Sequence, residues 1–378
     1  MQLVGKPQEG TPSSAAVAGI AAVGFYVPRY VIAAAEYRKA LGKFEAKDIE
    51  EKAVPGFDED EITMAVAAGE RALMGARAVD KLVFASSGTL AGARIVAEAL
   101  DVSPERARDI LGKTDAGETA LASAMDDASA NGASTLVLVS DAPRADPGSA
   151  EEHAFGAAAI ALLVTKEETQ IRMRGDEKAA MLRRIGDAGT ASVFVSSLES
   201  PIGSKSITAV TKALDDRVPV SYEQYVALRR YKPAPAGTEY SQGAYVSMPA
   251  YLGEAKARYR LVGEECAKCG RLHFPPRESC LACGARAWKE RPLKRTGAVY
   301  AYTIIGKGAA PSEFLEQQLA TGDYATAVVE LDDGLRITAM LADVDPAQVR
   351  IGMRVRMVFR RIYAQEGVVR YGFKFAPA

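Results

Sequence analysis

Four cysteines are the feature that most constrains this chain, because they form two close pairs, Cys266 with Cys269 and Cys280 with Cys283. The chain contains no other cysteine. Two C-x-x-C pairs can close a tetrahedron of thiolates around one Zn²⁺ at Zn–S distances of about 2.3 Å. A glycine follows each pair and allows the backbone to turn back beneath the metal. The spacing therefore predicts a zinc ribbon with a closed, structural Zn²⁺ site.

Other roles for these cysteines fit the sequence less well. A redox pair is typically a single C-x-x-C beside a βαβ unit, and a disulfide framework is typical of short secreted chains. His273 lies between the two pairs, but four thiolates already fill the tetrahedron. We therefore expect His273 to pack against the ribbon or to face solvent.

Length and composition limit the remaining possibilities. The chain has 378 residues, 48% of them apolar and 25% charged, which is enough for two or three globular domains. A net charge of −1 favours neither nucleic acid nor an anionic membrane. No apolar run approaches the roughly 20 residues that span a bilayer, and the N-terminus lacks a secretory core. We expect a flexible tail over residues 1–17 and a cytoplasmic protein.

The first half of the chain predicts an α/β domain over residues 18–230. Apolar, strand-like runs alternate with helical patterns there, which is typical of layers built around a mostly buried sheet. Asp58 or Asp60 is suited to cap the first long helix. The expected strands cover residues 17–24, 81–86, 135–140, 157–164 and 191–196, and the expected helices cover 62–76, 91–100, 115–131 and 222–230.

The second half predicts a smaller unit after a Pro- and Gly-rich linker at residues 231–247. Residues 248–290 should hold a helix at 249–259 and the ribbon. Residues 291–378 alternate apolar and polar residues with period two, and five such strands predict a small closed barrel, for which we choose the OB-fold. These strands are expected at residues 297–305, 325–331, 335–341, 353–359 and 368–375.

Several segments of this second half carry a family resemblance. They are residues 259–266 (YRLVGEEC), 274–277 (FPPR), 297–303 (GAVYAYT), 329–334 (VELDDG) and 351–355 (IGMRV). Residues 248–378 thereby resemble the zinc-ribbon/OB-fold acyl-CoA-associated family. The resemblance implies a rubredoxin-like ribbon and a non-catalytic partner of a thiolase-like enzyme that helps to hold or pass CoA thioesters. On this basis Arg277 and Lys307 are candidate contacts for the phosphates of CoA.

The front of the chain resembles a different family. Residues 19–30 (GIAAVGFYVPRY), 51–60 (EKAVPGFDED) and 95–100 (IVAEAL) are similar to archaeal-type hydroxymethylglutaryl-CoA synthases of the thiolase superfamily. The resemblance implies a thiolase-like layered fold. It is incomplete here, because only residues 166–217 remain to repeat the first half. An incomplete layer would leave an apolar face that needs a partner.

The residues that the synthase resemblance marks as catalytic are replaced. Thr114 lies nearest to the position of the nucleophilic cysteine, and it has no evident base to activate it. Residues 87–89 (SGT) lack the acid/base glutamate, and Asp187 replaces an asparagine. The synthase histidine has no counterpart, since His153 lies in the first half and His273 in the ribbon. We therefore assign no catalytic residue.

Charge is uneven in the last strands, where residues 350–378 contain seven Lys or Arg residues and one acid. Strand alternation places Arg354, Arg356 and Arg360 outward, and it places Val355, Met357 and Phe359 in the barrel. Such a face could meet single-stranded nucleic acid, the phosphates of CoA, or an acidic partner surface. Nucleic acid is the least favoured, because the chain as a whole is not basic.

Three polar clusters suggest chemistry by composition alone. We interpret Ser86 and Ser87 as a strand-ending turn, since no nucleophile elbow surrounds them. Ser140 and Asp141 follow a buried strand, where polar loops are common, and receive no role. Residues 151–153 (EEH) are interpreted as a solvated loop or helix start.

The sequence as a whole predicts a non-catalytic auxiliary subunit. It would bind a thiolase-like enzyme and an acyl-CoA, with structural zinc, in a hetero-oligomer and without a membrane. One alternative is a catalytically active, divergent hydroxymethylglutaryl-CoA synthase or acyltransferase that uses residues such as Thr114 and His153. A second alternative is an OB-fold protein that binds nucleic acid.

Overall fold

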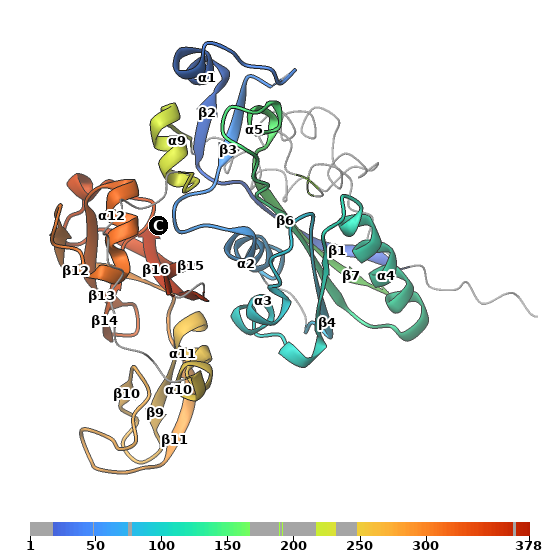
Figure 1. Ribbon diagram of the computed structural model, residues 1–378. Coiled ribbons are helices and arrows are strands. Elements are labelled where there is room, and N and C mark those ends of the chain that lie inside the picture. The colour runs from blue at the N-terminus through green and yellow to red at the C-terminus, as the bar shows by residue number, and fades with distance from the viewer. Residues whose placement is uncertain are drawn as a thin grey trace, which may run out of the picture.

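The computed structural model describes two parts of the chain that lie side by side (Figure 1). We call residues 18–231 the front part and residues 248–378 the module. The described residues are 18–47, 49–74, 78–166, 189, 191, 217–231, 248–365 and 368–378. The expected N-terminal tail, Asp187, nearly all of the linker and all but the first residue of the strand at 191–196 lie outside them.

A five-stranded sheet forms the centre of the front part, in the order β1-β7-β6-β4-β5. Strand β4 runs parallel to β5 and β6, whereas β7 is antiparallel to β6 and β1. Every residue of β6 and β7 is buried, as their continuous apolar runs predict. The strands are β1 Gly19–Tyr26, β4 Lys81–Ser86, β5 Ala107–Leu111, β6 Thr135–Asp141 and β7 Ala158–Thr165.

Helices cover both faces of this sheet (Figure 1). Helices α2 (Glu61–Ala72) and α3 (Ala93–Ala99) pack on one face, and α4 (Ala116–Asn131) packs on the other. Asp60 caps α2 through a capping box with Thr63, which confirms one of the two expected caps. The α/β layers predicted from the sequence are therefore present.

A second, smaller sheet was not expected from the sequence. Its strands are β3 (Glu51–Val54), β2 (Tyr30–Ala33) and β8 (Val218–Pro219), in that order. Around it lie α1 (Ala34–Leu41), α5 (Ala150–Ala154) and α9 (Tyr222–Leu228), which share an aromatic core with it.

This aromatic core corrects the solvent exposure expected for residues 152 and 153, whereas the expected helix start is present and Glu151 is exposed. Glu152 and His153 lie on α5, but both are fully buried. The His153 ring stacks on Phe44 and meets the Tyr37 ring edge-on. The backbone N–H of Glu45 donates to His153 Nδ1 at 2.9 Å. Packing of α1 and α5 against the small sheet removes these side chains from solvent.

The module begins with two short helices, α10 (Met248–Gly253) and α11 (Ala255–Arg260), where the sequence predicted one. The ribbon follows as a three-stranded sheet in the order β10-β9-β11. Its strands are β9 Val262–Cys266, β10 Leu272–His273 and β11 Trp288–Pro292. The ribbon projects from one end of the molecule (Figure 1).

A nearly closed barrel completes the module, with strand order β14-β13-β12-β15-β16. A bridge between Leu341 and Phe375 brings the two ends of the sheet together. All five predicted strands are present, and α12 (Leu315–Thr321) lies between the first two. The strands are β12 Thr296–Ile305, β13 Tyr324–Leu331, β14 Arg336–Met340, β15 Arg354–Gln365 and β16 Val368–Pro377. No helix among the described residues is long and apolar enough to span a bilayer.

Candidate functional site

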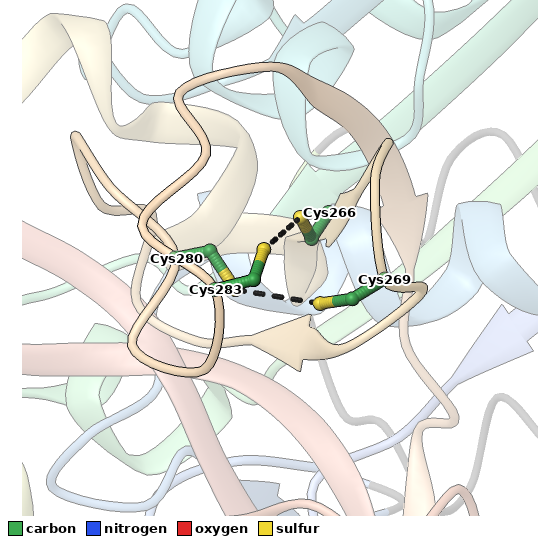
Figure 2. Close-up of side chains that lie close together, drawn as sticks. All are labelled: Cys266, Cys269, Cys280 and Cys283. Atoms are coloured by element: carbon green, nitrogen blue, oxygen red, sulfur yellow. Dashed lines mark hydrogen bonds between the residues drawn. The ribbon is translucent and has the colours of Figure 1, made fainter.

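The four cysteines of the ribbon converge on one point (Figure 2). Their sulfur atoms all lie within 4.8 Å of one another. The Sγ atoms of Cys266 and Cys283 are 3.6 Å apart, as are those of Cys269 and Cys280. Zn–S bonds of about 2.3 Å in a tetrahedron require sulfur separations of about 3.8 Å, so this thiolate set fits Zn²⁺. With four sulfurs bound, the metal is structural.

Two glycines shape the turns that carry these ligands. Gly270 and Gly284 adopt φ values of 72° and 70°, the left-handed region that favours glycine. Their backbone N–H groups donate to the carbonyl oxygens of Cys266 and Cys280, each at 2.9 Å. The expected turn beneath the metal is therefore confirmed.

His273 lies next to the cysteines rather than in solvent. His273 is 5% exposed, and its ring meets the ring of Trp288 edge-on, with centroids 5.1 Å apart. Its Nε2 lies 3.4 Å from Cys280 Sγ, so the imidazole N–H can donate to this thiolate. The sequence left packing and solvent exposure open for His273, and the structure shows packing. The hydrogen bond to a ligand was missed because β10 brings His273 across the turn.

The two candidate CoA contacts lie on different parts of the module. Arg277 is exposed in the ribbon loop before Cys280, where its backbone N–H donates to Glu264 Oε2 at 2.9 Å. Lys307 is exposed in the loop after β12. The structure does not join these two side chains in one pocket, and their role stays a prediction.

An ionic junction joins the module to the front part. Residues 58–60 (DED) lead into α2 and contact the basic strands β15 and β16. Arg360 is 2% exposed. Its Nη2 lies 3.2 Å from Glu59 Oε1 and donates to Asp343 Oδ2 at 2.9 Å. The same nitrogen donates to the hydroxyl of Tyr26 at 3.2 Å.

A second buried cation repeats this arrangement beside the first. Lys374 is 1% exposed, and its Nζ donates to Asp58 Oδ2 at 2.9 Å. The hydroxyl of Tyr371 donates to Asp60 Oδ2 at 2.7 Å. The backbone N–H of Arg361 donates to the carbonyl oxygen of Asp58 at 3.0 Å. The acidic residues 58–60 are thus all bound by strands from the module.

These contacts correct two expectations for β15. Arg354 and Arg356 are exposed as predicted, but Arg360 is buried instead of facing solvent. Phe359 does not lie in the barrel core but packs with the helices of the front part. Its ring stacks on Tyr371, with centroids 5.7 Å apart. The reason is that β15 continues to Gln365, beyond the closed part of the barrel, where the front part covers it.

The cations of the junction favour the ionised form of its buried carboxyl groups. Burial alone would raise the pKa of Asp58, but Lys374 and Arg360 outweigh it and keep that pKa below its usual value. Burial raises the pKa of Glu59, and Arg360 opposes this shift. Buried carboxylates of this kind are stable only with their cations in place.

The carboxyl edge of the front sheet holds a further group that sequence reasoning missed. Gly88 occupies the segment where the synthase resemblance places a glutamate. A Cβ added to Gly88 would lie 3.8 Å from Oε1 of Glu61, the first residue of α2. The pKa of Glu61 is raised to about 7. Burial is the largest cause, and the negative charge of the neighbouring Asp60 adds to it. A carboxyl group from another segment therefore lies next to the segment where the resemblance places one, and no local pattern signals it.

The same edge carries a network around a second buried acid. Asp141 Oδ1 accepts hydrogen bonds from Ser86 Oγ at 2.8 Å and from the Ser87 backbone N–H at 2.6 Å. Its other oxygen accepts from the backbone N–H of Ala191 at 2.8 Å. Asp141 therefore fixes a strand-ending turn, which confirms the interpretation of Ser86 and Ser87.

Thr114, the residue nearest to the expected position of the nucleophile, lies exposed in the turn before α4.

Comparison with known families agrees with both parts of the fold. Residues 254–289 match the family model described as ChsH2, rubredoxin-like zinc ribbon domain. Residues 290–360 match the model described as ChsH2, C-terminal OB-fold domain. The module is therefore a rubredoxin-like zinc ribbon followed by an OB-fold barrel.

Three relatives divide between the two parts. A DUF35 domain-containing scaffold protein of Methanocaldococcus jannaschii is 41% identical over 125 residues, which are 32% of this chain and 84% of that protein. The benzoylsuccinyl-CoA thiolase subunit BbsA of Thauera aromatica is 28% identical over 123 residues, 32% of this chain and 78% of that protein. A hydroxymethylglutaryl-CoA synthase of Aeropyrum pernix is 36% identical over 176 residues, 43% of this chain and 47% of that protein.

The synthase comparison covers only part of an enzyme. This chain spans about half the length of the synthase that it matches. The front part is therefore similar to a part of that synthase.

Proposed function

We propose that this chain, which belongs to the family of DUF35 domain-containing scaffold proteins, is a non-catalytic auxiliary subunit of an acyl-CoA thiolase or acyltransferase complex. The observation that carries the proposal is the contrast between a complete zinc module and a synthase-like half without a nucleophile. All four cysteines of the chain belong to the candidate zinc site. The partner enzyme would therefore supply the reactive thiol.

Two relatives support an auxiliary role. One carries the name scaffold protein, and another is named as a subunit of a thiolase. In the proposed complex the chain binds a thiolase-like enzyme in a hetero-oligomer and helps to hold the CoA thioester. Arg277 and Lys307 are exposed cations, which suits them to the phosphates of CoA.

Assays of the purified chain test this function. We expect no thiolysis or condensation of acyl-CoA by the chain alone, and activity only after addition of the thiolase-like enzyme that co-purifies with it from its native host. Turnover by the chain alone, at a rate comparable to that of the complex, would contradict the proposal.

A second candidate function is catalysis by the front part itself. Glu61 favours it, because its carboxyl group lies beside Gly88 and carries a pKa of about 7. Substitution of Glu61 or Thr114 separates the two functions. Loss of activity with zinc content and fold intact would favour an enzyme, whereas an unchanged activity of the complex would favour the scaffold.

Binding of nucleic acid finds less support in the geometry. Arg360 and Lys374 belong to the basic strands that suggested it, yet both are buried against carboxylates of the front part. These cations are not available to phosphates while the junction is closed. The basic strands instead meet an acidic surface within the same chain.

A further inference from the structure

We propose that helix α9 is an acid-sensitive latch, which closes over the small sheet at high pH and opens more readily as the pH falls. Beneath it lies Lys52 of β3, a lysine that is 1% exposed and forms no ion pair with any described residue. A cation buried in this way favours a state of the protein that returns it to water. This inference goes beyond the proposed function, because it concerns a response of the front part to pH and needs no partner enzyme.

The contacts of Lys52 replace little of the hydration that it loses on burial. Its Nζ lies 5.0 Å from the centre of the Tyr37 ring on α1 and 5.2 Å from that of the Tyr225 ring on α9. It also donates a hydrogen bond to the backbone carbonyl oxygen of Glu152 on α5. An ammonium group has three N–H donors, so one carbonyl oxygen and two ring faces leave it poorly solvated. Since Tyr225 belongs to α9, closure of this helix completes the burial of the amine.

The charged groups around Lys52 compensate only partly for its burial. The Glu152 carboxylate attracts the ammonium, but it also accepts the backbone N–H of Gly148 and the hydroxyl of Tyr222. The guanidinium of Arg229, directly after α9, repels a second positive charge. The pKa of Lys52 is therefore lowered from 10.5 to about 7. Burial is the largest cause, the carboxylate opposes it, and the guanidinium adds to it.

Other titratable groups on the surrounding helices do not supply the missing negative charge. Burial raises the pKa of Tyr37, Tyr222 and Tyr225, so their hydroxyls stay neutral. His153 on α5 is neutral as well, because its Nδ1 accepts the backbone N–H of Glu45 and burial lowers its pKa below 6.5. Between pH 6.5 and pH 9 the lysine is therefore the group of this cluster that changes its charge.

The end of α9 shows which contacts the latch holds. The guanidinium of Arg230 lies over the Phe57 ring, 4.1 Å from its centre, and Nη2 donates to the Phe57 carbonyl oxygen at 2.6 Å. Its Nε lies 3.5 Å from Oε1 of Glu316, which belongs to α12 of the module. Helix α9 thus lies between the small sheet and α12 (Figure 1). Opening of α9 therefore moves Arg230 away from a contact in each part of the molecule.

The direction of the pH effect follows from the pKa of the amine in the two states. When α9 opens, Lys52 meets water and recovers its ordinary pKa of 10.5, so the open state binds the proton more tightly than the closed state. The open population therefore rises as the pH falls from about 10.5 to about 7, and it levels off below that. We expect the ratio of open to closed α9 to rise roughly seventyfold between pH 9 and pH 6.5.

Hydrogen exchange of the full-length, zinc-loaded chain tests this inference. The reporters are the backbone N–H groups of Tyr225 and Arg229, which donate to the carbonyl oxygens of Ser221 and Tyr225, each at 2.9 Å. A helix of seven residues is unstable by itself, so these amides exchange when α9 leaves the sheet. After correction for the intrinsic pH dependence of exchange, their protection should fall roughly seventyfold from pH 9 to pH 6.5.

Helix α4 is the internal control, because it belongs to a different apolar cluster from α9. Its protection should change far less between the same two pH values. Protection of α9 that does not vary with pH, or that falls only as much as that of α4, would overturn the proposal. This comparison uses the wild-type protein alone.

Substitution of the lysine identifies the group responsible. Lys52→Met keeps an unbranched side chain without the amine. The protection of α9 should then be nearly independent of pH between 6.5 and 9, and at pH 6.5 it should exceed that of the wild type. Lys39→Met is the matched control, because Lys39 is exposed on α1, and it should keep the wild-type profile.

Zinc content and circular dichroism confirm that each variant is folded. A wild-type pH profile in folded Lys52→Met would assign the effect to another group and overturn the proposal. If Lys52→Met does not fold, the comparison of α9 with α4 in the wild-type protein still decides.

Discussion

The zinc centre and the junction both hold charged groups away from solvent, but they are encoded differently in the chain. The zinc ligands come from two neighbouring turns, and each turn contributes a C-x-x-C pair. The junction joins residues as distant as Asp58 and Lys374, which lie 316 positions apart. Local spacing therefore specifies all four ligands of the metal site. A run of like charges specifies only that some opposite charge is needed, and not where it lies.

Loss of a zinc ligand should have the largest effect and should stay local if this comparison is right. Cys280→Ser breaks the thiolate tetrahedron, and the ribbon then loses metal-binding free energy on the order of 10 kcal/mol. Trp288 is the only tryptophan of the chain and contacts His273 in the ribbon, so its fluorescence reports ribbon unfolding. Zinc content gives the second measurement.

Ser279→Ala provides the matched control, because Ser279 is exposed and adjacent to Cys280. It should retain zinc and wild-type fluorescence. The barrel has its own apolar core, so we expect its circular dichroism to survive in Cys280→Ser. Full zinc binding by Cys280→Ser would disprove the assigned ligand set.

Breaking the junction should have the next largest effect. Asp58→Asn leaves Lys374 buried without its carboxylate, and we expect a loss of about 3 kcal/mol in the free energy of unfolding, measured with denaturant. Since its cations lower the pKa of Asp58 in the folded protein, this stabilisation is present at neutral pH. It is lost as the pH falls through the folded pKa.

The exposed pair between Asp332 and Arg354 supplies the control for Asp58→Asn. Asp332→Asn should change stability little, because solvent screens an exposed ion pair. Equal losses in the two variants would remove the distinction between a buried junction and ordinary surface charge.

Much of the fold could be predicted from local patterns. The buried strands β6 and β7 follow from continuous apolar runs, and the five barrel strands follow from period-two alternation. The zinc ligands follow from spacing. The small sheet with β2, β3 and β8 was missed, because two of its strands have only four residues and the third has two.

The rest could not be predicted because it depends on which segments meet. Alternation correctly gave the orientation of Arg354, but it could not show that the front part covers Arg360. Likewise, the synthase resemblance placed a glutamate in the segment of residues 87–89, but nothing local showed that Glu61 lies beside Gly88. Long-range contacts decide the environment of such side chains, and sequence spacing does not contain them.

Glu61 should give a smaller, pH-dependent effect. Its pKa of about 7 exceeds the ordinary value of 4.5, so the folded protein binds this proton more tightly than the unfolded chain. Its contribution to stability is therefore complete at low pH and decreases as the pH rises from about 4.5 to about 7. Glu61→Gln should remove this decrease and gain up to about 3 kcal/mol at pH 8, by denaturant unfolding across pH.

Glu105→Gln is the control for the pH profile, because Glu105 is exposed beside Arg94. It should leave the profile of the wild-type protein unchanged. A profile for Glu61→Gln that matches the wild type would show that the folded protein does not perturb this carboxyl group.

His273 should give the smallest effect, and it tests whether the zinc centre is purely local. His273→Phe keeps an aromatic ring against Trp288 but removes the N–H that lies 3.4 Å from Cys280 Sγ. Hydrogen bonds to metal ligands typically change metal affinity by about ten- to a hundredfold, so we expect roughly tenfold weaker zinc binding in competition with a chelator. The fold should be retained, because all four ligands remain.

Leu272→Met is the comparison for this variant, since it changes the preceding residue of β10 without touching the hydrogen bond. It should bind zinc as the wild type does. If His273→Phe also binds zinc with wild-type affinity, the C-x-x-C spacing accounts for the whole centre, and the contrast with the junction becomes stronger. If its affinity falls as expected, even the most local site in the chain depends on a residue that the cysteine spacing does not reveal.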